Sequence, residues 1–309
     1  MTELDLQPEQ IEAALAHIDP VFRRTPQFSD VRLAGALRRD AVVKVETLNP
    51  IGSFKARGAS VLVRELDPSR AWVCATAGNF GQALAYLARE LGAAVDVFVG
   101  PRVPELKIAR MRAFGARVAV REQPEAAARE HAAAGDTRLL VVDAQDPAMA
   151  AGAGTIGVEL AAAGPFGAVL VQVGDGALIS GIACWLKSVA PETRIVGVCA
   201  SGAPAMARSF AAGHAVPFEG DGTIATAIAI TEPIPESVAR VKALVDQIVL
   251  VDDDDLRRAV ALIADCLGLL VEPAGAAGVA ALLRHGDELP DGRVAAILTG
   301  AADRDLAAL

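Results

Sequence analysis

The sequence has few aromatic residues, few lysines and fewer basic than acidic side chains. Aromatic residues make up 4% of the 309 residues, and only five of the 29 basic residues are lysine. The 38 acidic residues bring the formal net charge to −9 at pH 7. Proteins that bind nucleic acids or anionic membranes typically carry basic clusters, and single-strand binders add aromatic platforms. We therefore expect neither nucleic acid nor membrane as a partner.

The sequence also lacks the pattern of a membrane-spanning or secretory segment. The uncharged stretch 160–174 contains Gly164 and Pro165 and is shorter than the ~18–20 apolar residues of a spanning helix. The chain begins with an acidic, amphipathic segment, whereas a secretory signal begins with basic residues followed by an apolar stretch. This pattern favours a cytoplasmic protein.

Cysteine and histidine give no sign of a disulfide framework or a metal site. The four cysteines are widely spaced, lie in apolar runs and form no Cys-x-x-Cys motif. The four histidines are not close in sequence to a cysteine or to one another. We expect buried free thiols in a reducing compartment, and no metal.

The remaining composition is that of a folded, aliphatic protein of one large or two smaller domains. Hydrophobic residues make up 53% of the chain, and 64 residues are alanine. Apolar runs predict strands over 41–46, 71–76, 94–99, 116–120, 139–142, 168–173, 194–199, 248–251 and 294–299. Longer patterns predict helices over 82–91, 178–189, 253–267 and 276–283. Because most of the strand runs are apolar throughout, we expect parallel strands buried on both faces, that is, an α/β fold.

A lysine-containing segment follows the first of these strands. Residues 49–59 read NPIGSFKARGA, which places a Pro-Gly turn before a predicted helix. Ser53 is the expected N-cap, and Lys55 then lies in the first helical turn, where the helix dipole disfavours an ammonium. From the residues alone, Lys55 is either an ordinary exposed lysine or an amine with a lowered pKa that forms a Schiff base.

Two glycine-containing loops each follow a predicted strand and open a predicted helix. They read TAGNFGQ at 76–82 and VGDGALISG at 173–181. The backbone N–H groups of such a turn can hold an anion, although glycine is also what a tight turn requires.

Two further patterns have simpler interpretations. The segment 152–157, GAGTIG, fits the dinucleotide fingerprint but has no strand directly before it, so we expect no nicotinamide dinucleotide there. The acidic run 252–255 is predicted to cap and begin a helix, because acidic side chains suit a helix N-terminus.

Eight short motifs occur in order along the chain. They are RTP at 24–26, KVE at 44–46, GSFKARGA at 52–59, AGN at 77–79, GAGTIGVE at 152–159, LISG at 178–181, VEPAGAA at 271–277 and LTG at 298–300. Together they resemble the fold-type II pyridoxal-phosphate (PLP) enzymes, in particular the serine/threonine dehydratase and serine racemase family. The resemblance implies a fold like that of tryptophan synthase β, with two parallel-sheet-based domains and the cofactor in the cleft between them. The large domain would comprise 1–74 and 149–309, and the inserted small domain 75–148.

The resemblance also implies site residues. Lys55 would form the Schiff base with PLP and act as the catalytic base. The other cofactor-binding residues would be Phe54, Asn79, Gly174, Asp175, Gly176, Ala177, Leu178 and Thr299, with Asn79 at the ring hydroxyl and Thr299 at the pyridine nitrogen. The substrate would be held by Ser53, Thr76, Ala77, Gly78 and Asn79.

The activity implied is β-elimination of water from L-threonine, L-serine or both, giving a 2-oxo acid and ammonia. A hydroxyl at the pyridine nitrogen does not enforce its protonation, which favours loss of a β-substituent over transamination. A homodimer is expected because the family usually forms one. A PLP-dependent β-replacement synthase and a non-catalytic PLP-binding paralogue remain as alternatives.

Some positions depart from the family pattern at the expected cofactor and catalytic sites. The phosphate loop reads Gly-Asp-Gly-Ala in place of four glycines, so the Asp175 side chain must point away or be paired. Phe80 replaces a histidine, and Ala77 stands where racemases carry a serine, which argues for elimination over racemisation. Cys199 stands where metal-using members have a glutamate, so no divalent metal is expected.

Two further segments leave the substrate open. Residues 225–227 are ATA where the family has ADG, and 300–303 are GAAD where it has GGN. The chain is also expected to carry no regulatory domain after the catalytic unit.

Overall fold

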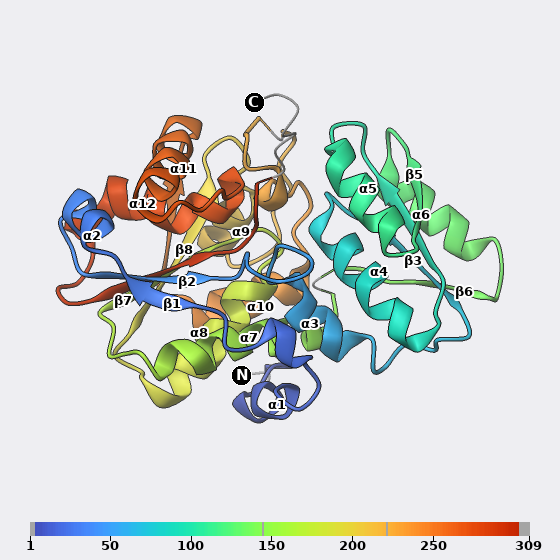
Figure 1. The fold of residues 1–309 in the computed structure, drawn as a ribbon, viewed down its shortest axis with the longest axis horizontal. Helices are drawn as coiled ribbons and strands as arrows, with labels where there is room; N and C mark the ends of the chain where they lie inside the picture. The colour runs from blue at the N-terminus through green and yellow to red at the C-terminus, as the bar shows by residue number, and fades with distance from the viewer. Residues whose placement is uncertain (1–3, 144, 221, 303–309) are drawn as a thin grey trace.

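The computed structural model describes residues 4–143, 145–220 and 222–302. Two open sheets, each covered by helices, make up the molecule, and helix α3 (Lys55–Leu62) lies where the two halves meet (Figure 1). The half drawn in cyan and green carries the smaller sheet. The other half contains both the blue beginning and the red end of the described chain.

The larger sheet has six strands in the order β1-β2-β10-β7-β8-β9. Five of them are parallel, and β1 pairs with β2 in antiparallel orientation at one edge, so the sheet is mixed. Its strands are β1 (Gln27–Ser29), β2 (Ala41–Val45), β7 (Ala168–Gln172), β8 (Arg194–Ala200), β9 (Gln247–Val251) and β10 (Val294–Leu298).

The smaller sheet has four parallel strands in the order β5-β4-β3-β6. They are β3 (Ala71–Ala75), β4 (Val95–Val99), β5 (Arg117–Val120) and β6 (Arg138–Leu140). This sheet begins at Ala71, four residues before the predicted boundary of the small domain. The division of the chain into domains at 75–148 remains a prediction.

Helices connect the strands and cover the faces of the sheets. They are α1 (Pro8–Ala14), α2 (Val31–Leu37), α4 (Asn79–Leu91), α5 (Glu105–Ala113), α6 (Pro124–Ala133), α7 (Pro147–Ala161), α8 (Ala177–Val189), α9 (Ala205–Ala212), α10 (Pro235–Leu244), α11 (Asp253–Leu267) and α12 (Ala277–His285). Short 3₁₀ turns are η1 (Pro20–Phe22), η2 (Thr226–Ile228), η3 (Pro273–Ala276) and η4 (Gly286–Glu288). In the part of the chain described, none of these helices is long and apolar enough to cross a bilayer.

The strands form because their apolar runs can be covered on both faces. Strands β2, β4, β7 and β10 are buried at every residue, as expected for parallel strands between layers of helices. All nine predicted strands overlap observed ones, and the acidic run 252–255 caps α11 through a reciprocal pair of hydrogen bonds between Asp252 and Asp255. The four cysteines are free and buried, as predicted.

Candidate active site

A cavity of about 660 Å³ lies between the two sheets, at the carboxyl ends of β3, β6 and β7. Such a crevice is where open α/β sheets bind their ligands. The lining includes eleven of the thirteen predicted site residues: Phe54, Lys55, Thr76, Ala77, Gly78, Asn79, Gly174, Asp175, Gly176, Ala177 and Leu178. The other two, Ser53 and Thr299, are buried beside it. The roles assigned to these residues remain predictions.

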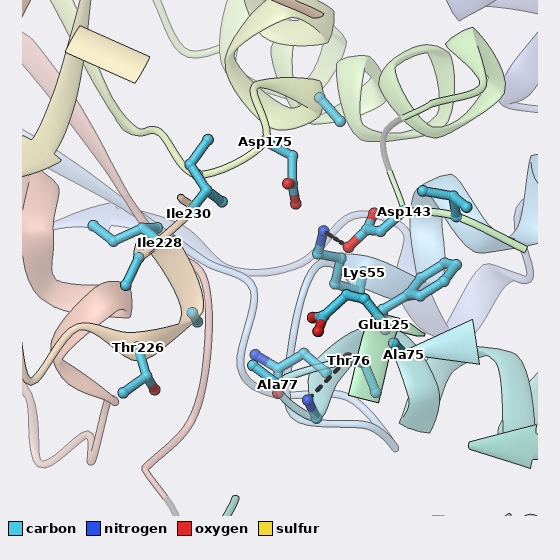
Figure 2. Close-up of a pocket in the computed structure, with 18 of the residues that line it drawn as sticks. Lys55, Ala75, Thr76, Ala77, Glu125, Asp143, Asp175, Thr226, Ile228 and Ile230 are labelled. Carbon is cyan, nitrogen blue, oxygen red and sulfur yellow. Dashed lines mark hydrogen bonds and ion pairs between the residues drawn. The ribbon is translucent and has the colours of Figure 1, made fainter. Parts of the chain in front are cut away.

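Lys55 is the first residue of α3, and its amine points into the cavity (Figure 2). The expected N-cap is wrong: Phe54 occupies the cap position without a side-chain hydrogen bond, and Ser53 instead forms a β-bridge with Gly300. This bridge ties the start of α3 to the chain that follows β10, which fixes where Lys55 enters the site.

The Lys55 amine forms an ion pair with Asp143, which follows β6 in the other half of the molecule (Figure 2). Its side chain is only 15% exposed, so Lys55 is not an ordinary surface lysine. Burial by itself lowers the pKa of Lys55, but the Asp143 and Asp175 charges outweigh that effect and raise the pKa above its usual value. The expectation of a lowered pKa is therefore wrong while Asp143 holds the amine.

Asp175 is the second carboxylate beside Lys55. It lies in the loop between β7 and α8, and its side chain points into the cavity toward the Lys55 amine (Figure 2). Burial, followed by the Asp143 charge, raises the pKa of Asp175 to about 6, and Lys55 opposes the shift. The Asp175 side chain thus does not point away from the cavity: it faces Lys55, whose charge acts on it without a direct ion pair.

The loop around Asp175 is shaped to hold an anion. Gly176 is the N-cap of α8 at φ 95°, and a Cβ there would lie 2.8 Å from Ser237 Oγ. A Cβ on Gly174 would lie 3.2 Å from Ile228 Cα, so both positions favour glycine. The N–H groups of the first turn of α8 have no acceptors within the helix, which makes them donors for a phosphate.

A second anion-binding loop follows β3. Gly78 is the N-cap of α4 at φ 130°, and its N–H donates to Thr76 Oγ1 at 2.9 Å. A Cβ on Gly78 would collide with the Lys107 side chain, so the loop requires glycine for its conformation and for space. The N–H groups at the start of α4 suit a carboxylate, which is the role that the resemblance implies.

Glu272 joins the two halves across the cavity. Asn79 Nδ2 donates to Glu272 Oε1 at 2.9 Å, and Lys107 Nζ from α5 pairs with Glu272 Oε2 at 2.8 Å. Glu272 belongs to the VEPAGAA motif, yet its place in the site could not be read from the sequence. Asp143 was missed for the same reason, although its position just after a predicted parallel strand was a usable signal.

The Thr299 hydroxyl is oriented by a neighbouring amide. Gln172 Nε2, from the last residue of β7, donates to Thr299 Oγ1 at 2.7 Å. Because the oxygen already accepts this hydrogen bond, the hydroxyl hydrogen is left to donate to another acceptor. This matches what the predicted position at a pyridine nitrogen requires.

Four of the sequence motifs meet beneath α3 in a buried charge network. Arg57 pairs with Glu46 at 2.9 Å and with Glu159 at 2.7 Å, and Lys44 pairs with Glu159 at 2.5 Å. The Thr25 hydroxyl also donates to Glu46. These motif residues hold α3, and with it Lys55, against β2 and α7.

A family model described as "Pyridoxal-phosphate dependent enzyme" matches residues 18–300. The chain belongs to this family. Among curated members, L-threonine ammonia-lyase of Thermotoga maritima is 33% identical over 94% of this chain and 74% of that protein. Among solved structures, a threonine deaminase from T.th. has a TM-score of 0.90 at 32% identity, covering 96% of this chain and 99% of the other. Maize serine racemase has a TM-score of 0.89 at 26% identity, covering 98% and 95%.

Membership of the pyridoxal-phosphate family implies the cofactor, and the cavity fits it. An amine, a glycine-shaped loop at a helix N-terminus and an oriented hydroxyl are the groups that the aldehyde, phosphate and pyridine nitrogen need. Asp175 does not suit the phosphate. A carboxylate at the mouth of a phosphate loop repels the phosphate unless that carboxylate is paired or protonated. The fold class expected from the sequence, a fold-type II PLP enzyme, is confirmed.

Proposed function

We propose that the protein is a PLP-dependent ammonia-lyase that acts on L-threonine, L-serine or both and releases a 2-oxo acid and ammonia. The observation that carries the proposal is the Lys55 amine in a cavity between two helix N-termini, those of α4 and α8. Relatives named threonine ammonia-lyase and threonine deaminase, at 32–33% identity over nearly the whole chain, support the same activity.

Each part of the cavity has a defined task in this reaction. When bound, the cofactor supplies the electron sink that makes the substrate Cα–H acidic. The start of α8 holds the phosphate, and loop 76–79 holds the substrate carboxylate through backbone N–H groups. Lys55 takes the Cα proton as general base, which requires that its amine leave Asp143 and lose a proton first.

The lining of loop 76–79 supports elimination over racemisation. A racemase needs a second acid–base group on the face of the substrate opposite Lys55, and the position expected to carry it is Ala77. An alanine can neither donate nor accept a proton. A β-replacement synthase would use the same first step and differ only in admitting a second nucleophile.

We further propose a homodimer in the cytoplasm. Four buried free cysteines suit a reducing compartment, and the family pattern is what suggests the dimer.

The test is to load the purified protein with PLP, record its absorbance, and assay 2-oxo acid and ammonia with single amino acids. Lys55→Ala should lose both the absorbance band of the lysine–cofactor linkage and at least ~10³-fold in kcat, because the nucleophile and the base are the same amine. Lys242→Ala is the matched control, since Lys242 is exposed on α10 and lies against the ring of Phe210. It should keep both properties.

Three results would contradict the proposal. A protein that stays colourless with added PLP would refute the cofactor site, and Lys55→Ala with wild-type turnover would refute the role of Lys55. A coloured protein that consumes serine only when a thiol or another nucleophile is added would be a replacement synthase.

A further inference from the structure

The charges that line the cavity are unbalanced. The lining has two basic side chains, Lys55 and Arg129, and six carboxylates, Glu122, Glu125, Asp143, Asp175, Glu232 and Glu272. Glu272 is paired with Lys107, so five carboxylates remain against the two basic side chains. A hydroxyamino acid brings a carboxylate and the cofactor brings a phosphate. Both groups are negatively charged and are repelled by the carboxylates that line the cavity. Complementarity between a site and its ligand therefore points to a substrate with additional positive charge.

In this structure Asp143 already binds an alkylammonium group, the side-chain amine of Lys55. One carboxylate oxygen of Asp143 pairs with the Lys55 amine, while Oδ1 is buried and has no hydrogen-bond partner among the described residues. Leaving a buried acceptor without a donor is costly, so Oδ1 offers a place for a second N–H donor. Asp175 points toward the same amine from the opposite side (Figure 2).

The function proposed above removes the Lys55 ammonium from this position. As the general base of the proposed reaction, the Lys55 amine must be neutral and free of Asp143. Asp143 and Asp175 then lose the cation that balances them. Unpaired carboxylates in a partly buried site are destabilising, so an ammonium brought by the substrate would take the place that Lys55 leaves.

We propose that the site takes α-amino acids with a second amine on Cβ, of which L-2,3-diaminopropanoate is the simplest. This inference rests on the proposed function and specifies its substrate class. Asp143, with Asp175 beside it, binds the second ammonium. Lys55 removes the Cα proton, the Cβ–N bond breaks with its electron pair on nitrogen, and ammonia leaves. Hydrolysis of the released enamine gives pyruvate and a second ammonia, so one substrate and one water yield one pyruvate and two ammonia.

Two carboxylates suit this leaving group better than a hydroxyl. An ammonium leaves as neutral ammonia without further protonation, and ionised carboxylates hold it by accepting its hydrogens. A hydroxyl must receive a proton as it leaves, and an ionised carboxylate has none to donate. Glu125, which points into the cavity between Lys55 and loop residues Thr76 and Ala77 in Figure 2, adds to the negative potential.

The experiment compares kcat/KM of the PLP-loaded enzyme for L-2,3-diaminopropanoate, L-serine and L-threonine. We expect the diamino acid to exceed L-serine at least tenfold and to release two ammonia per pyruvate, where L-serine releases one. Asp143→Asn keeps the shape of the side chain without its charge and should lower the ratio of the two kcat/KM values at least tenfold. Glu130→Gln, the same acid-to-amide change at an exposed position of α6, should leave the ratio unchanged.

Each outcome separates this inference from the proposed function. Turnover of L-serine or L-threonine without turnover of the diamino acid overturns the inference and leaves the proposed function standing. Turnover of the diamino acid alone supports the inference. In that case the diamino acid, and not L-serine or L-threonine, is the substrate of the proposed elimination. An Asp143→Asn enzyme with the wild-type ratio refutes the role of Asp143.

Discussion

At the scale of single residues, Glu159 shows how the motif residues act together. It accepts hydrogen bonds from Arg57 and from Lys44, which come from α3 and β2. Burial favours its neutral form, but the Arg57 and Lys44 hydrogen bonds and charges outweigh burial and lower the pKa of Glu159 to about 2. The carboxylate is thus ionised wherever the protein is folded at moderate pH, and it balances two buried cations.

The pKa of Glu159 predicts a pH dependence of stability. Because the folded pKa is depressed from 4.5 to about 2, its stabilisation is complete above pH 4.5 and is lost as the pH falls toward 2. The full contribution is roughly 3 kcal/mol by linkage. Glu159→Gln should therefore lower the free energy of unfolding at pH 7 by about 3–5 kcal/mol, because Lys44 loses its ion pair and Arg57 keeps only its ion pair with Glu46.

Urea unfolding at pH 7 and at pH 3, followed by circular dichroism, checks this prediction. The difference between wild type and Glu159→Gln should shrink at pH 3, where the wild-type carboxylate has lost most of its advantage. Glu130→Gln, at an exposed site, should stay within about 0.5 kcal/mol of wild type at both pH values. If wild type and Glu159→Gln differed in free energy of unfolding by the same amount at both pH values, the ionised Glu159 carboxylate would not be the source of the stabilisation.

At the scale of elements, the GAGTIG segment packs α7 closely against its neighbours. Gly152 approaches the backbone of Arg57 in α3, and Gly154 approaches the carbonyl oxygen of Gly181 in α8. A Cβ on Gly154 would lie 2.9 Å from that oxygen. The glycines thus serve helix–helix contact, and the expectation that this segment is no dinucleotide loop agrees with its place inside a helix.

We predict that Gly181→Ala is strongly destabilising. A Cβ there would collide with the Ala150 carbonyl oxygen and lie 2.6 Å from Gly154 N, and backbone atoms cannot move aside cheaply. The expected loss is about 1–3 kcal/mol or more, measured by thermal unfolding. Gly35→Ala is the matched control, because Gly35 is exposed in α2 with nothing within 4 Å of its Cβ position. It should be stabilising by up to ~1 kcal/mol, so equal effects of the two substitutions would refute the packing argument.

The elements were predictable where one local signal dominates. Apolar runs identified nine of the strands, and α11 matched its predicted bounds because an acidic cap and a C-terminal Gly268 mark its ends. Strand β1 has three residues, two of them polar, and carries no such run. The cap of α3 was misassigned because Ser53 is held by Gly300, far away in the sequence.

At the scale of the whole molecule, the site depends on segments that only the fold brings together. Lys55, Asp143, Asp175 and Glu272 come from four places in the chain: the start of α3, the segment after β6, the loop between β7 and α8, and the residue before η3. The motifs identified the lysine and both glycine loops. They could not identify which carboxylates face the amine, because that depends on how the two sheets approach each other.

Because of the strand order, the two sheets can form at different times during synthesis. The four strands of the smaller sheet lie within residues 71–140, whereas the larger sheet pairs β2 with β10, residues 41–45 with 294–298. We expect nascent chains stalled after about 200 residues to protect the smaller sheet from protease and to leave β2 exposed, since contacts between distant segments form last. Protection of β2 at that length would contradict this order.

The pairing of early and late strands in the larger sheet has a consequence for assembly of the site. Lys55 leaves the ribosome early, but the β-bridge partner of Ser53, Gly300, is among the last described residues to emerge. The lysine is therefore synthesised long before the bridge that sets its position can form. We expect the chain to bind the cofactor only after Gly300 has emerged, so that order of synthesis and gain of chemistry are linked.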